Sequence, residues 1–537
     1  MDPCDDATCE PLTVAPVAAL GLAVSWSVGV FMAWKFQPMQ DLGHHMAIAA
    51  VVADRGREGL LYTALYEPFD PLLANSLLYL CAGYAGRLIG VTLAVRLGIA
   101  AFLAALPLAT LYALRSVGRS AWAALLSVPF CYGMLFIAGV ANMLFAAPLF
   151  VLALPLFDRA LRRPSPTIVA LTSCVIALVF LAHAHLFLWL GPLTIVMTLA
   201  RLVSKRADGW KAMASVALNA LVIVLPALLL FARWYGRSFG AGRGAGAVLG
   251  QTATLSEGYG AVFKPLRQLI HDLGAGPSQA LRSGDDVRWL AVAVSFLVVS
   301  RLVTFVLERR AKVPSRSWLL ELSCLATFAA YFVLPEDIQN QAGISSRHVN
   351  MALWLAPVFA APVAASLSLV WRRVSIVAIV LLVTSHQALW FSSLRNFEAR
   401  EAFGLDQVLA AAPPRHRLHY VKLSPESTYF LGGSWWHVEK FYMSDSFGFT
   451  ADTTGIQSTG TIRYVDGAQI HRIGFHRHDW PRAQEIWDNF DLVLVHRWAP
   501  SAQMLTMASA HADRVAKAGE WELWRTRRAQ NADEMTK

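Results

Sequence analysis

The stretch at residues 120–157 reads SAWAALLSVPFCYGMLFIAGVANMLFAAPLFVLALPLF and contains no Asp, Glu, Lys or Arg in 38 positions. About 20 apolar residues are enough for one helix to cross a bilayer. The stretch is therefore long enough for a helical hairpin with two membrane spans. A second stretch, at residues 164–200, has the same property over 37 positions. This pattern predicts a polytopic α-helical membrane protein.

The composition of the whole chain agrees with this prediction. Of the 537 residues, 56% are hydrophobic and only 15% are charged, and the mean hydropathy is +0.46. A soluble domain carries about 25% charged residues, so a soluble globular protein and a disordered protein are both excluded. Further apolar stretches bring the predicted number of spans to eleven: residues 12–34, 88–114, 212–232, 289–307, 317–335, 349–371 and 374–394.

The distribution of Lys and Arg predicts how these spans are oriented. With eleven alternating spans, the short loops on one side hold 15 basic residues in 33 positions. On the other side, loops 35–87, 233–288 and 336–348 hold 12 in 122. Cytoplasmic loops are enriched in Lys and Arg, so the first side is predicted to be the cytoplasm. The formal net charge of +10 then reflects membrane topology, and nucleic-acid binding is not expected.

The composition changes after the last predicted span. Residues 395–537 carry 17 basic and 17 acidic residues, with apolar runs at 418–423 and 490–495 that are typical of strands. We predict a membrane domain over residues 1–394, with long external loops 35–87 and 233–288, and a small extracytoplasmic α/β domain over residues 395–537. For the aromatic residues of Trp435-Trp436-His437 in this tail, structural or sugar-stacking roles are open.

The first predicted external loop holds the most informative polar residues. Asp41, His44 and His45 are spaced i, i+3 and i+4, which places all three on one side of a helix that begins near Asp41. Two roles are open for Asp41: an N-cap of this helix, or a carboxylate beside imidazoles that acts as a general base or holds a divalent cation. The two adjacent histidines favour the second role.

A second group lies at the turn of the second apolar hairpin. His183 and His185 fall on the same predicted side of the membrane as Asp41. They are either hydrogen-bonded residues at the end of a span or supporting and metal-binding partners of Asp41.

A third group consists of candidate phosphate ligands. Arg347 and His348 stand directly before an apolar stretch. Arg347 is either an interfacial anchor whose stem packs on apolar surface or a phosphate ligand, because the planar guanidinium matches phosphate oxygens. Arg243 and Lys264, in the long loop 233–288, are further candidates for the same role.

The arrangement resembles the GT-C superfamily of integral-membrane glycosyltransferases, which use polyprenyl-phosphate sugar donors. The resemblance rests on the first loop Gln40-Asp41-Leu42-Gly43-His44-His45, about eleven spans, a late loop with Arg347 and a C-terminal extracytoplasmic domain. It implies that Asp41 lies at the active site as base or metal ligand, with Mg or Mn as the candidate cation, and that Arg347 holds the lipid phosphate.

The resemblance also implies an activity and a location. We expect hexosyl or pentosyl transfer to a lipid, glycan or protein acceptor at the extracytoplasmic face of a bacterial inner membrane. The main alternative is a transporter or flippase of lipid-linked saccharides, which would carry ionisable residues near the middle of its spans. The predicted spans contain Arg96, Arg301, Glu321 and His386. The larger polar groups lie at the predicted external boundary, which favours surface chemistry.

Overall fold

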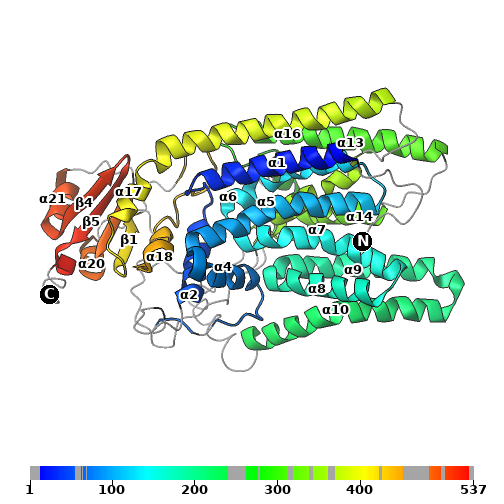
Figure 1. Cartoon of the computed structure of the whole chain (residues 1–537), viewed down its shortest axis with the longest axis horizontal. Helices are drawn as coiled ribbons and strands as arrows, with labels where there is room; N and C mark the ends of the chain where they lie inside the picture. The colour runs from blue at the N-terminus through cyan, green and yellow to red at the C-terminus, as the bar shows by residue number, and fades with distance from the viewer. Residues whose placement is uncertain are drawn as a thin grey trace.

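Two parts follow each other along the long axis of the molecule: a bundle of long helices and a small sheet surrounded by short helices (Figure 1). We call the end of the bundle that faces the sheet the sheet end, and the opposite end the far end. The computed structural model describes residues 13–54, 62, 65–67, 69–239, 262–275, 279–311, 318–337, 343–360, 369–421, 426–450, 483–496 and 502–530.

Seven helices among the described residues are long and apolar enough to cross a membrane. They are α1 (Val14–Ala33), α5 (Val91–Ser116), α7 (Ala141–Arg162), α9 (Ala184–Ser204), α10 (Trp210–Phe239), α13 (Asp285–Ala311) and α16 (Leu369–Phe397). Shorter helices complete the bundle: α2 (Leu42–Asp54), α4 (Leu77–Ile89), α8 (Pro166–Ala182), α14 (Trp318–Val333) and α15 (Ile344–Leu355). The polytopic helical fold is confirmed, whereas the predicted count of eleven spans is not confirmed.

The stretch at residues 120–157 forms a hairpin of unequal halves. Its second half is the long helix α7, but its first half is broken into the 3₁₀ helices η1 (Ala121–Ser127) and η2 (Pro129–Cys131) and the short helix α6 (Met134–Ala138). Irregular backbone is tolerated at membrane depth only where protein covers it, and most residues of this half are buried. Hydropathy alone predicted two helices here because it does not register the interruptions at Pro129 and Gly133.

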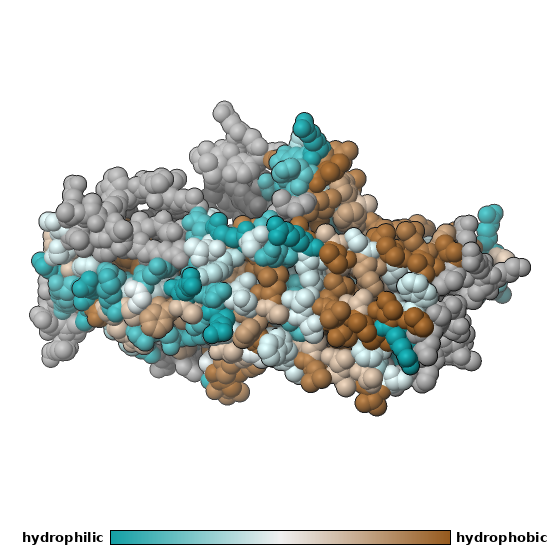
Figure 2. Space-filling model, turned by 90° about the horizontal axis from the view of Figure 1, so that it is seen from above, coloured by the Kyte–Doolittle hydropathy of each residue, from teal (hydrophilic) through white to brown (hydrophobic). Residues whose placement is uncertain are grey.

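The surface of the molecule matches a membrane environment. On the face shown in Figure 2, hydrophobic residues gather over the helix bundle and hydrophilic residues over the part that carries the sheet. Exposed apolar side chains on the outer helices include Leu229, Leu302 and Leu381. Extended exposed apolar surface marks a membrane or protein contact, and here it covers helices of spanning length. The chain is an integral membrane protein.

The C-terminal part is a five-stranded sheet with strand order β2-β1-β3-β5-β4. The strands are β1 (Arg417–Val421), β2 (Phe449–Thr450), β3 (Leu492–His496), β4 (Ala512–Ala518) and β5 (Trp521–Thr526). β1 is parallel to β2 and β3, whereas β5 is antiparallel to β3 and β4. The described residues of this part also form the short helices α17 (Leu405–Ala410), α18 (Lys440–Ser446), α20 (Ala483–Asn489) and α21 (Ala502–His511). The two predicted strands are β1 and β3, so the small α/β domain is confirmed.

The sheet and the bundle share one hydrophobic core. Trp435 is 1% exposed and stacks on Phe397 at the end of α16, with ring centroids 4.7 Å apart. Phe441 of α18 packs edge-on against Phe36, which follows α1, at 5.0 Å. A continuous cluster of buried side chains runs from the helices to one face of the sheet. Trp435 is therefore a core residue, which favours the structural role over sugar stacking.

Candidate active site

Asp41 lies at the start of a helix that is enclosed on every side. All 13 residues of α2 are buried, and α4, α5 and α18 pack against it. The backbone N–H of Asp41 donates to the carbonyl of Ala138 at 3.1 Å, and its carbonyl accepts from the N–H of His45 at 3.1 Å. Gly139 has φ +72°, and a Cβ there would lie 2.6 Å from the nitrogen of Asp41. The end of α6 therefore fixes the position of Asp41.

The carboxyl group of Asp41 is reachable by solvent and still surrounded by protein. Its side chain is 39% exposed, yet burial raises its pKa to about 7, against the opposing charge of Arg347. Part of the side chain therefore reaches solvent while many protein atoms surround the carboxyl group. A carboxylate with a pKa near neutrality is matched to work as a general base at physiological pH.

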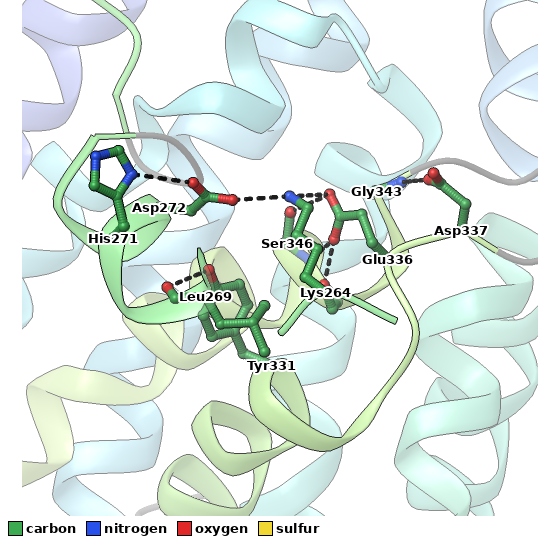
Figure 3. Close-up of polar contacts among 10 residues, drawn as sticks. Lys264, Leu269, His271, Asp272, Tyr331, Glu336, Asp337, Gly343 and Ser346 are labelled. Atoms are coloured by element: carbon green, nitrogen blue, oxygen red, sulfur yellow. Dashed lines mark hydrogen bonds and ion pairs between the residues drawn. The ribbon is translucent and has the colours of Figure 1, made fainter. Parts of the chain in front are cut away.

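A hydrogen-bond network holds the start of α15, the helix that carries Arg347 (Figure 3). Glu336 accepts hydrogen bonds from the hydroxyl and the backbone N–H of Ser346 at 2.6 and 3.2 Å, and also from the hydroxyl of Ser345. Asp337 accepts from the N–H of Gly343 at 3.1 Å. Burial alone would raise the pKa of Glu336, but these serine hydrogen bonds and the charge of Lys264 hold it below its usual range.

Arg347 lies in the first turn of α15, near enough to two carboxylates to experience their charges. Burial lowers its pKa, while the charges of Glu336 and Asp41 act in the opposite direction. An Arg side chain remains protonated in proteins even so. The network around Glu336 thus places a permanent positive charge beside Asp41, although the two residues lie far apart in the sequence.

Lys264 and Arg243 are the two candidate phosphate ligands in loop 233–288. Lys264 pairs with Asp272 at 3.1 Å and with Glu336 at 3.4 Å (Figure 3). Two carboxylates therefore compensate its charge, and in this arrangement Lys264 supports the start of α15. Arg243 lies outside the described residues.

Three of the predicted histidines form a row beside Arg347. The ring centroids of His183 and His185 are 6.2 Å apart, and those of His185 and His348 are 5.0 Å apart. His183 caps α9, because its Nδ1 accepts from the N–H of Leu186 at 3.4 Å, and Nδ1 of His348 lies 2.9 Å from the carbonyl of Ile344. The charge of Arg347 acts on all three. The structure thus gathers residues from distant segments, while their catalytic roles stay predictions.

His45 is occupied by the fold. Its Nε2 accepts from the N–H of Ala141 at 3.1 Å, so the proton lies on Nδ1, which donates to the hydroxyl of Tyr79 at 2.6 Å. Neither nitrogen is left to bind a metal. In the part of the chain that the structure describes, no three His, Cys, Asp or Glu side chains lie close enough together to hold a metal ion. The divalent cation stays a prediction, and we derive no step through it.

His437, from the C-terminal part, completes the surroundings of Asp41. Its Nε2 lies 3.5 Å from Oδ1 of Asp41, and its ring lies 5.0 Å from the ring of His44. In the sequence His437 follows two tryptophans, and nothing there predicts that it lies at Asp41. No local pattern connects the tail with the first loop, so only the folded arrangement could reveal this contact.

A cavity of about 730 Å³ lies elsewhere, between the start of α5 and α18. Its lining includes Lys35, Arg96 and Asp445, but neither Asp41 nor Arg347. Lys35 pairs with Asp445 at 2.9 Å, and Arg96 donates to the carbonyl of Trp34 at 2.7 Å. Lys35 thus joins the bundle to the C-terminal part and Arg96 joins α5 to the end of α1, so we place the candidate site at Asp41 and not in this cavity.

The fold defines a class: an integral-membrane helix bundle with a small sheet domain at one end, the GT-C fold. Solved structures with a similar fold include ArnT from Cupriavidus metallidurans bound to undecaprenyl phosphate and ArnT from the same organism in the apo state. Each has a TM-score of 0.55 and 13% sequence identity, and the matches cover 95% of this chain and 97% and 98% of ArnT. No protein-family model and no curated protein matches the sequence. The predicted GT-C fold is confirmed.

Proposed function

We propose that the chain is a glycosyltransferase that moves a hexose or pentose from a polyprenyl-phosphate donor to a hydroxyl group of a lipid, glycan or protein acceptor. The observation that carries the proposal is that Asp41, a carboxylic acid with a pKa of about 7, lies near enough to the guanidinium of Arg347 at the sheet end of the bundle for the two charges to interact. The shared fold with ArnT, a protein solved with undecaprenyl phosphate bound, supports a lipid-linked donor.

The two groups have complementary tasks in this reaction. Arg347 binds oxygens of the donor phosphate through its planar set of N–H donors. Asp41 takes the proton of the acceptor hydroxyl, whose oxygen forms a bond to the anomeric carbon. The bond between that carbon and the phosphate oxygen breaks, and polyprenyl phosphate leaves with the bonding electrons. A cation already in place where negative charge develops stabilises such a transition state.

Donor binding and base strength are coupled in this scheme. The positive charge of Arg347 opposes the rise in the pKa of Asp41. A phosphate bound to Arg347 would offset that charge, so the pKa of Asp41 would rise further: the ionised carboxylate would be a stronger base, but a smaller fraction of it would be ionised at neutral pH. The proposal therefore links proton removal from the acceptor to the presence of the donor.

We further propose a bacterial inner-membrane location with the sheet end outside the cytoplasm. Arg159 and Arg162 at the end of α7, together with Arg201 near the end of α9, lie at the far end. Their concentration there supports a cytoplasmic far end.

The alternative, a transporter or flippase, finds less support in the contacts of the ionisable residues inside the bundle. Glu321 accepts from Arg119 at 2.6 Å and from Arg301 at 3.0 Å. His386 packs among aromatic rings, with Trp289 at 4.5 Å. Ionisable groups with such fixed contacts stabilise the packing of the helices. A transporter would instead need ionisable groups that exchange partners along the substrate pathway.

The decisive test compares Asp41→Asn with Arg347→Ala in nanodiscs. The first assay measures binding of undecaprenyl phosphate. The second measures how fast undecaprenyl phosphate is released from an undecaprenyl-phosphate hexose or pentose, with extracted membrane lipids and glycans as acceptors. Asp41→Asn should keep lipid binding and lose at least about 100-fold in release, because only the base is removed. Arg347→Ala should weaken lipid binding.

A matched control is Asp208→Asn, which removes a carboxylate in the turn after α9 whose side chain is 51% exposed and pairs with Lys205. This variant should behave like the wild type in both assays. Absence of undecaprenyl phosphate binding by the wild-type chain, or normal release by Asp41→Asn, would refute the proposal.

A further inference from the structure

We propose that His437 is a positioning residue for Asp41, and that the C-terminal part is a component of the catalytic unit and not a separate binding module. The inference rests on the proposed function. Its structural core is the contact between Nε2 of His437 and Oδ1 of Asp41 at 3.5 Å. The side chain of His437 is only 9% exposed, so solvent screens this contact less than it would screen a surface pair.

The tail segment that carries His437 is fitted closely to the first loop. A Cβ at Gly43 would lie 2.2 Å from the carbonyl oxygen of His437, so the two backbones can approach only because residue 43 is a glycine. Gln40, the residue directly before Asp41, accepts through its Oε1 from the N–H of Gly433 at 3.3 Å. Contacts on both sides of Asp41 therefore hold His437 in place.

The polar groups around Asp41 come from several different segments. Arg347 of α15 acts on it as a positive charge, and His437 of the tail contacts it directly. His44 of α2 faces the ring of His437 at 5.0 Å, and Tyr79 of α4 lies near enough to experience the charge of Asp41. An N–H donor or a positive charge beside a carboxylate favours its ionised form. His437 therefore orients one carboxylate oxygen and leaves the other for the acceptor proton.

The test uses His437→Ala and His437→Gln, with His511→Ala as the control. His511 is the last residue of α21, in the C-terminal part of the molecule (Figure 1). The first readout needs no substrate: the pH dependence of labelling of Asp41 by a water-soluble carbodiimide, which reacts with the protonated carboxyl group. Loss of the His437 ring in His437→Ala should move the labelling midpoint up by about one pH unit, because a polar group beside the ionised carboxylate is removed. His437→Gln, which keeps an N–H donor, should restore part of the difference, and His511→Ala should match the wild type.

The second readout is release of undecaprenyl phosphate from an undecaprenyl-phosphate hexose or pentose. His437→Ala should lower kcat about tenfold and leave KM for the donor unchanged, because the donor phosphate is assigned to Arg347. An unchanged midpoint together with unchanged kcat would overturn the role of His437. If the wild-type chain releases no undecaprenyl phosphate, the proposed function fails, and the labelling midpoint still decides whether His437 positions Asp41.

Discussion

Replacement of Gly43 by Ala sets two physical effects against each other at the candidate site. Within a helix, Ala is favoured over Gly by up to about 1 kcal/mol, so helix propensity alone predicts a small gain in stability. The added Cβ would, however, lie 2.2 Å from the carbonyl oxygen of His437, whereas ordinary van der Waals contact begins near 3.4 Å. The tail backbone or α2 must therefore move by about 1 Å.

The size of the effect follows from that displacement. Overpacking of this kind costs about 1–3 kcal/mol, which cancels or exceeds the gain in helix propensity. A displacement of about 1 Å at a reacting group can lower the rate about 100-fold. Because His437 contacts Asp41 at 3.5 Å, we expect Gly43→Ala to lose about 100-fold in transfer while its melting temperature falls by only a few degrees.

The assay combines release of undecaprenyl phosphate with thermal unfolding in nanodiscs. Gly29→Ala in α1 is the matched control, because a Cβ there meets nothing within 4 Å, and it should keep both the rate and the melting temperature. A Gly43→Ala variant with wild-type transfer and unchanged carbodiimide labelling of Asp41 would refute the close fit between the tail and α2.

Two further predictions concern pH. With a pKa of about 7, Asp41 is protonated and inactive as a base below that value, so transfer should rise about tenfold per pH unit in the acid range and level off above pH 7; a rate independent of pH between about 5 and 8 would contradict this. Glu336 has a pKa below its usual range, so its stabilisation is present above pH 4.5 and is lost as the pH falls through the folded-state value. The melting temperature of the wild type should therefore fall more between about pH 6 and pH 3 than that of Glu336→Gln, and equal falls would argue against the network at α15.

The sequence predicts the helical membrane fold and two central strands, because apolar length and alternation are local properties. It also places Asp41 and Arg347 near one membrane boundary, because topology follows from counting spans. The helical spacing of Asp41, His44 and His45 predicted that they lie on one side of a helix, but spacing does not show that α2 is enclosed. The contact between His437 and Asp41 depends on tertiary packing, which no local pattern encodes.

Adjacent histidines on α2 show how enclosure separates the roles of neighbouring residues. His45 is held by Tyr79 and Ala141 through both ring nitrogens, whereas His44 faces His437 of the tail. One histidine thus anchors α2 to the bundle, and the other lies where the tail meets Asp41. Burial raises the pKa of Asp41 and the charge of Arg347 lowers it, so a phosphate on Arg347 would weaken only the second effect. On this reasoning, donor binding makes the ionised Asp41 a stronger base and moves its titration to higher pH, while the closely fitted tail keeps the carboxyl group oriented.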